Sequence, residues 1–247
     1  MLRPGQVGAQ RRCARTGERR GVDDSKGACR DAMKRAPRRV GVADDEKEEG
    51  LRVTESERVR IRAIRTLSDD WYVLKKTTFD FLRRDGTWQT QNRETYDRGN
   101  GAAILLYNRE HGTVVLIRQF RFPAFVNGLA DGMLIEVCAG LLDKDDPEAC
   151  IKKEAEEEAG FVVRNPRKVF EAYMSPGSVT EKLFFFVAEY EHEHRISAGG
   201  GDEKEGEDIE VLEIPLEKAL EMIALGEIRD AKTVMLLQYA KLEKLLE

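Results

Sequence analysis

Histidine and cysteine are scarce in this chain, whose 247 residues include only 3 His and 4 Cys. The cysteines at positions 13, 29, 138 and 150 form no C-x-x-C pair, and no histidine lies at the spacing of a zinc ligand. Structural zinc sites and disulfide frameworks need such clusters. We therefore expect neither of them here.

Long apolar runs are also missing. The longest, Ala102–Tyr107 and Leu183–Ala188, are far below the roughly 18 to 20 residues that span a bilayer. No apolar segment of the signal-peptide type stands near the first residue. The sequence predicts a soluble protein without a membrane partner, located in the cytoplasm.

Aromatic residues and isoleucine are absent from residues 1–52, which are rich in Arg, Gly, Asp and Glu. Such a segment buries too little apolar surface to offset the entropy lost on ordering. We predict a disordered, charged tail. Its acidic residues weigh against a transit peptide, although a targeting role and a later start, such as Met33, both stay open.

Positive charge is concentrated in that tail. Residues 1–39 hold 12 of the 41 Lys and Arg but only 4 of the 46 Asp and Glu, so the remainder carries 29 against 42, a net charge of -13. Nucleic-acid binding depends on cationic surface that neutralises phosphates. An acidic body makes nucleic acid an improbable partner and suits a protein that gathers divalent cations.

Short β-rich runs begin at about Val53, and a composition of 41% apolar residues supports one sizeable core. Asp85-Gly86 lies between two runs and indicates a hairpin turn. We predict strands at 59–65, 71–81, 88–96, 102–107, 114–118, 134–137, 168–173, 183–190 and 209–214, and helices at 147–159, 216–224 and 232–246. The order predicts an α+β sandwich in which helices flank a mixed sheet.

The segment 139–161 has the pattern of a strand, a loop, a helix and a stop. Asp146 suits the N-cap, Pro147 the first helical position, and Gly160 the left-handed residue after the helix. The apolar stripe expected to pack on the sheet is Ile151, Ala155 and Ala159.

Acidic side chains crowd one side of this helix. Glu154 and Glu158 are four residues apart, with Glu157 beside them, and like charges at that spacing are destabilising by a few tenths of a kcal/mol. One explanation is a solvated face, on which Glu156 pairs with Lys152. The other is a site for Mg²⁺, which prefers carboxylate and carbonyl oxygens. The glutamates alone leave both open.

The whole segment resembles the Nudix box, a loop-helix-loop that contains an Arg-Glu pair and a later Glu-Glu-x-Gly. Glu154 matches the Glu of the first pair, Glu157 and Glu158 match the second pair, and Gly160-Phe161 match its closing positions. Lys153 replaces the box Arg.

The loop before this helix departs from the box as well. It is one residue short after Gly140, so the early acidic position of the box falls on Asp145 or Asp146. Residues 69–237 nevertheless resemble the GDP-mannose pyrophosphatase subgroup of the Nudix superfamily, which shares both departures. The segments that carry the resemblance are 96–102, 115–121, 138–142, 173–177 and 226–230.

The resemblance implies a Nudix α/β/α sandwich at 99–247, preceded by N-terminal antiparallel strands at 53–98 that serve in dimerisation and substrate contacts. It implies metal ligands at the Ala139 carbonyl, Glu154, Glu158 and Glu207, and catalytic roles for Glu154, Glu157, Glu158 and Glu207. It implies substrate contacts at Trp71, Arg93, Glu94, Arg121, Ala139, Gly140, Leu141, Glu158, Glu181 and Lys232. Trp71 would stack on the guanine base.

The implied activity is hydrolysis of a nucleotide sugar, GDP-mannose, to GMP and mannose 1-phosphate, with Mg²⁺ as cofactor and Mn²⁺ as a substitute. Cations and positive side chains neutralise the phosphates, and a carboxylate, Glu207 or Glu181, takes the proton from water. The subgroup also implies a homodimer that exchanges N-terminal strands. Two alternatives remain, because a fold alone does not choose a function: another substrate such as ADP-ribose, or a Nudix-like nucleotide-binding module without catalysis.

Overall fold

The computed structural model describes residues 56–142, 144–202, 204 and 206–247, so the predicted tail lies outside the described residues. The strands are β1 Val59–Asp69, β2 Val73–Leu82, β3 Trp88–Asp97, β4 Gly101–Asn108, β5 Thr113–Phe120, β6 Met133–Glu136, β7 Cys138–Leu141, β8 Arg167–Tyr173, β9 Lys182–Glu189 and β10 Glu210–Pro215. The helices are α1 Phe122–Val126, α2 Pro147–Glu154, α3 Leu216–Ala224 and α4 Ala231–Leu242, with a π-helix η1 at Ala155–Ala159 and a short 3₁₀ turn η2 at His192–His194.

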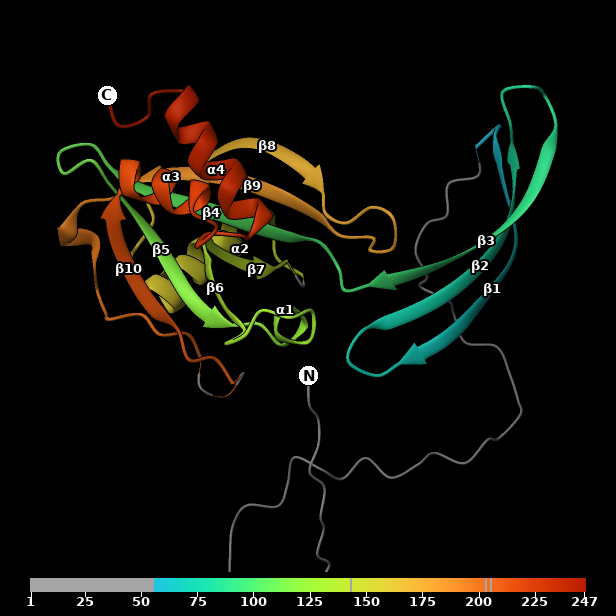
Figure 1. Cartoon of the computed structure of the whole chain (residues 1–247), viewed down its shortest axis with the longest axis horizontal. Helices are drawn as coiled ribbons and strands as arrows, with labels where there is room; N and C mark the ends of the chain where they lie inside the picture. The colour runs from blue at the N-terminus through green and yellow to red at the C-terminus, as the bar shows by residue number, and fades with distance from the viewer. Residues whose placement is uncertain (1–55, 143, 203, 205) are drawn as a thin grey trace, which may run out of the picture. The chain divides into compact units, whose positions relative to one another are not determined.

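The strands form two sheets (Figure 1). Strands β1, β2 and β3 make an antiparallel sheet in chain order, and Gly86 turns the β2–β3 hairpin with a φ of 81°, as the Asp85-Gly86 pair predicted. The larger sheet has the order β10-β5-β4-β9-β8, with β6 also paired to β5 and β7 to β4. Only β4 and β9 pair in parallel among these strands, so the sheet is mixed.

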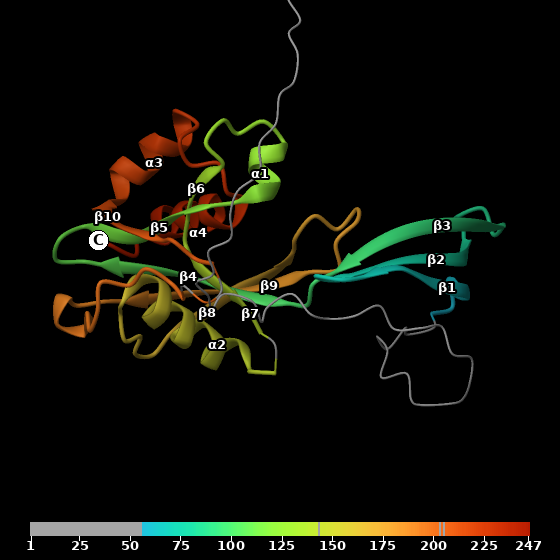
Figure 2. The ribbon, with the colours of Figure 1, turned by 90° about the horizontal axis from the view of Figure 1, so that it is seen from below.

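Helices cover both faces of the larger sheet (Figure 2). On one face the predicted stripe of Ile151, Ala155 and Ala159 is fully buried against the sheet. On the other face α3 and α4 bury a second cluster, which includes Ala219 and Leu236. Burial of apolar area on this scale is the main force that holds the three layers together. The predicted α/β/α sandwich is confirmed.

Three details differ from the sequence prediction. The predicted helix 147–159 is α-helical only to Glu154 and continues as a π-helix to Ala159, after which the Gly160 nitrogen donates to the carbonyls of Ala155 and Glu156. The final helix ends at Leu242 rather than 246. Helix α1 was not predicted, since it is short and lies between stronger patterns, whereas β7 is the strand expected at the start of the segment 139–161. None of the described helices is long and apolar enough to cross a bilayer.

Candidate active site

One pocket of about 420 Å³ gathers most of the residues that the sequence pointed to. Its wall includes strand β7, the consecutive helices α2 and η1, the end of β5, and residues 202 and 206–208. Its side chains fall into aromatic, acidic and basic sets. The lining residues include Trp71, Tyr72, Arg98, Gln119, Phe120, Arg121, Ala139, Gly140, Leu141, Lys153, Glu154, Glu157, Glu158, Asp202, Glu207 and Asp208.

Glu158 is the buried acid of this pocket. It lies on η1 with 2% of its surface exposed, and its carboxylate accepts a hydrogen bond from the Ala139 nitrogen at 3.0 Å. Burial and the nearby Glu154 carboxylate raise the pKa of Glu158 to about 8, although the Ala139 bond opposes them. Two adjacent anionic groups in a desolvated place are costly unless a cation lies between them.

Glu154 lies directly against the backbone of β7. A Cβ atom at Gly140 would overlap the carboxyl group of Glu154. Glycine at 140 is therefore what allows this carboxylate to approach the strand. The glycine at this position of the loop pattern is thus required by the space that Glu154 occupies, and not by a turn.

The glycine-rich segment 199–201, which the sequence suggests is a flexible loop, is hydrogen-bonded to the acidic helix. The Gly200 nitrogen donates to the Glu158 carbonyl at 3.0 Å, and the Gly201 nitrogen donates to the Glu157 carbonyl at 3.1 Å. The following turn returns Glu207 to the pocket, where its carboxylate accepts from the Asp202 nitrogen at 3.0 Å. The loop therefore brings a distant acid beside the helix.

The remaining charged side chains of this helix interact with neighbours on the helix itself. Lys152 contacts Glu148 at 2.6 Å, one turn earlier in the helix, so the predicted Lys152–Glu156 pair is wrong. Lys153, in the position of the box Arg, contacts Glu157 at 3.1 Å. Asp146, one of the two candidates for the early box acid, accepts from the nitrogens of residues 148 and 149 and caps the helix.

The donor set of the pocket suits a hard divalent cation. Its oxygens come from the Ala139 carbonyl and from Glu154, Glu158 and Glu207, which are the ligand types that Mg²⁺ prefers. Among the described residues, no three acidic, histidine or cysteine side chains converge as a complete metal site. Burial first, and then the carboxylates of Glu154 and Glu207, raise the pKa of Glu158, so a bound cation would stabilise the ionised form of this group.

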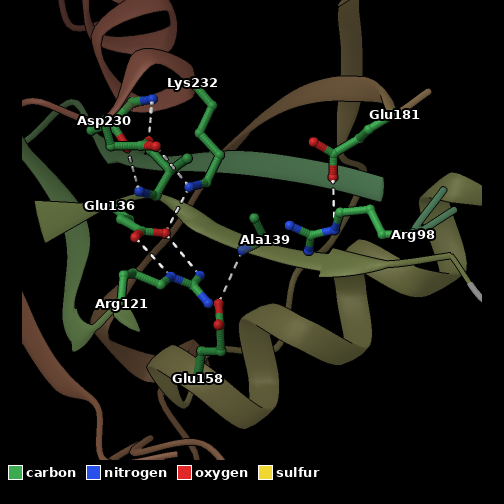
Figure 3. Close-up of polar contacts among 10 residues, drawn as sticks. Arg98, Arg121, Glu136, Ala139, Glu158, Glu181, Asp230 and Lys232 are labelled. Carbon is green, nitrogen blue, oxygen red and sulfur yellow. Dashed lines mark hydrogen bonds and ion pairs between the residues drawn. The ribbon is translucent and has the colours of Figure 1, made fainter. Parts of the chain in front are cut away.

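A buried ion network lies behind Arg121, whose guanidinium lies beside Glu158 (Figure 3). Arg121 donates through Nε and Nη2 to the two carboxylate oxygens of Glu136, each at 2.9 Å. Lys232 donates to the same carboxylate at 2.6 Å and contacts Asp230 at 3.1 Å. Arg121 lines the pocket, whereas Lys232 does not. Glu136 was not among the predicted site residues, because in the sequence it is only a charged residue at the end of an apolar strand.

A second ion pair joins Arg98 of the pocket wall to Glu181 at 3.4 Å. Glu181 is not itself a lining residue. Arg93 and Glu94 lie on β3, exposed and outside the pocket of their own chain. Of the predicted site residues, the structure brings together Trp71, Arg121, Ala139, Gly140, Leu141, Glu154, Glu157, Glu158 and Glu207; it leaves outside the pocket lining Arg93, Glu94, Glu181 and Lys232.

Comparison with known proteins covers most of the chain. Residues 58–96 match the family described as the N-terminal domain of the GDP-mannose pyrophosphatase NudK, and residues 97–237 match the NUDIX domain. A protein of Citrobacter koseri named GDP-mannose pyrophosphatase is 58% identical over 184 residues, which are 74% of this chain and 95% of that protein. Proteins of the same name from Enterobacter sp. and Salmonella typhimurium are 57% and 58% identical, over 76% and 73% of this chain and 98% and 94% of their own lengths.

Proposed function

The chain belongs to the Nudix hydrolase family, and we propose that it hydrolyses the pyrophosphate bond of GDP-mannose to give GMP and mannose 1-phosphate. The observation that carries the proposal is the match to proteins named GDP-mannose pyrophosphatase over nearly their whole length. The pocket supports it, since acids, an arginine and an exposed tryptophan line one space. A nucleoside diphosphate sugar needs a group of each kind.

The proposed cofactor is Mg²⁺, with Mn²⁺ as a substitute. Ala139, through its carbonyl, and Glu154, Glu158 and Glu207 are the groups that would hold it. A bound divalent cation neutralises the charge of the diphosphate oxygens. Glu157, which contacts Lys153, completes the acidic set at the edge of the site.

The residues of the chain divide the remaining tasks. Arg121 presents its guanidinium to a phosphate, since it lines the pocket beside Glu158. Glu207 accepts the proton of the attacking water; we prefer it to Glu181, because Glu181 is paired with Arg98 and does not line the pocket. Lys232 adds positive charge from behind Glu136.

Trp71 is the proposed base-binding residue. Its side chain is 79% exposed at the pocket, and the ring of Tyr72 lies 6.1 Å away in an edge arrangement. The Arg98 guanidinium lies 5.6 Å from the Tyr72 ring. A planar, exposed aromatic face next to a cation suits a purine base joined to a diphosphate.

We propose a homodimer in the cytoplasm. Among the described residues, the β1–β3 sheet has no buried apolar side chain, and Ile64 and Leu67 of β1 are exposed. A small sheet without a covered face is marginally stable alone. A second copy that covers this sheet would bury its exposed apolar side chains. It would also place Arg93 and Glu94 at the pocket of the neighbouring chain. Cys138 and Cys150 are buried thiols that form no disulfide among the described residues, which suits a reducing compartment.

Two experiments test these proposals. The purified chain with Mg²⁺ is incubated separately with GDP-mannose, ADP-ribose and other nucleotide sugars, and the products are separated by chromatography. GMP and mannose 1-phosphate should form fastest. Faster cleavage of ADP-ribose would overturn the substrate, and no cleavage of any of them would favour a binding module. Sedimentation velocity should give twice the mass of one chain, and a monomer would remove the dimer.

A further inference from the structure

Glu136, the last residue of β6, is a buried carboxylate that does not line the pocket. Only 1% of its side chain is exposed, and both oxygens accept hydrogen bonds from cationic groups. Two of these bonds come from Arg121 in a side-on, bidentate arrangement. Such pairs fix the plane of a guanidinium as well as its position.

The charge of Glu136 is permanent at any ordinary pH. Burial alone would raise its pKa, but Lys232 and Arg121 outweigh burial and lower the pKa to about 2. One carboxylate between two cations would leave an excess positive charge. Asp230 contacts Lys232 at 3.1 Å, so the four charges cancel. Balanced charge is the condition under which an ion network of this kind can be buried.

The backbone around the network is fixed as well. Asp230 caps α4 by accepting from the Thr233 nitrogen at 3.0 Å, and the Thr233 hydroxyl accepts from the Val137 nitrogen at 2.8 Å. The start of α4 is thereby joined to the residue that follows Glu136. The backbone nitrogen of Arg121 donates to the Gly132 carbonyl at 2.8 Å, so the backbone of this partner of Glu136 is held as well.

Arg121 is the member of the network that opens on the pocket. Its side chain is 39% exposed, against 1% for Glu136 and 11% for Lys232. The nitrogens that face Glu136 are Nε and Nη2, so Nη1 is not used in that pair. Glu158 is near enough that its charge helps raise the pKa of Arg121 (Figure 3). A released Arg121 would therefore have a second carboxylate within reach.

We propose that Glu136 is a positioning residue, which holds the Arg121 guanidinium at the pocket wall, ready for a substrate phosphate, and keeps it from turning onto Glu158. Without this restraint Arg121 would neutralise a carboxylate that the cation needs. Glu136 would then support both phosphate binding and cation binding without contacting the substrate or the cation. The substrate half of this inference rests on the proposed hydrolysis of GDP-mannose, and the cation half rests only on the proposed Mg²⁺ site.

The test is a double-mutant cycle measured by Mg²⁺ titration calorimetry without substrate. Glu136→Gln alone leaves two cations buried and can fail to fold, so the main variant is the charge-balanced pair Glu136→Gln with Lys232→Met. Arg121→Met is made in this background and in the wild type. Melting temperatures confirm that each variant is folded. Glu213→Gln is the matched control, because that partly buried carboxylate accepts from Thr113 and Tyr190 outside the pocket.

The charge-balanced pair should bind Mg²⁺ about 10-fold more weakly, the usual size of an outer-shell effect. Removing Arg121 should restore most of that loss in the pair background and should have little effect in the wild type. The pair should also raise the KM for GDP-mannose more than it lowers kcat. An equal effect of Arg121→Met in both backgrounds, or a wild-type KM for the pair, would overturn the inference. No turnover by the wild type would contradict the proposed function alone, since the calorimetric cycle needs no substrate.

Discussion

The carboxylate of Glu158 accepts a hydrogen bond from the backbone nitrogen of Ala139 at 3.0 Å. This bond joins the acidic π-helix η1 to strand β7 through two residues that are 19 positions apart in the chain. It places a side-chain oxygen and a strand backbone at one wall of the pocket. The same residue is buried beside Glu154, so its protonation and the binding of a cation are linked.

The metal-free protein should lose stability as the pH rises from about 6 to 8. Burial and Glu154 raise the pKa of Glu158 from the ordinary 4.5 to about 8, so its contribution is fully present below 4.5 and is lost as the pH rises through 8. Mg²⁺ should therefore raise the melting temperature more at pH 8 than at pH 6. The Glu158→Gln variant should lack this difference, and an equal Mg²⁺ effect at the two pH values in the wild type would contradict the linkage.

Glu136 should contribute to stability with the opposite pH dependence. Its pKa is lowered to about 2, so its contribution is present above about 4.5 and is lost as the pH falls through 2. Glu136→Gln should lower the free energy of unfolding by about 3 kcal/mol at pH 7, because it leaves two buried cations without their carboxylate. Urea unfolding at pH 7 and pH 3 measures this. The difference between wild type and variant should shrink at the lower pH, and a constant difference would exclude an ionised Glu136 as its source.

Gly140→Ala should impair the site more than the fold. The added Cβ would overlap the Glu154 carboxyl group, which must then leave β7. We expect a loss of Mg²⁺ affinity and of turnover of about 10-fold or more. Gly177→Ala is the matched control, because nothing lies within 4 Å of its added Cβ. If both variants keep wild-type Mg²⁺ affinity, cation binding does not require the contact of Glu154 with β7.

Trp71→Ala should raise the KM for GDP-mannose and change kcat little. Stacking on an aromatic side chain contributes about 1 to 3 kcal/mol per base, which corresponds to roughly a 5- to 150-fold rise in KM. Trp88→Ala is the control, since Trp88 packs under the Arg60 guanidinium in the same small sheet and does not line the pocket. An equal response to both substitutions would assign the effect to the sheet rather than to the base.

Local patterns in the sequence predicted much of the fold. The four-residue spacing of Ile151, Ala155 and Ala159 placed the buried face of the central helix, and Asp146 was predicted as its cap. The α-to-π transition was not predictable, because the same residues suit either helix. It is visible only in the backbone hydrogen bonds, in which the Gly160 nitrogen reaches the Ala155 carbonyl five residues earlier.

The acidic half of the site follows from one short segment, but its basic half does not. Glu136 acquires its role from Arg121, 15 residues earlier, and Lys232, 96 residues later. No spacing rule connects three such positions before the strands and α4 are assembled. Likewise, the contact of Glu181 with Arg98 depends on how β9 and the end of β3 are brought together.

The most direct test of the account is the rate of GMP formation from GDP-mannose by the wild type and by Glu158→Gln, each with Mg²⁺ and with excess EDTA. We predict Mg²⁺-dependent turnover by the wild type, its loss in EDTA, and a loss of at least about 100-fold in a folded variant. Glu213→Gln should keep the wild-type rate. Undiminished GMP formation by Glu158→Gln, or by the wild type in EDTA, would contradict a cation-dependent active site at this pocket.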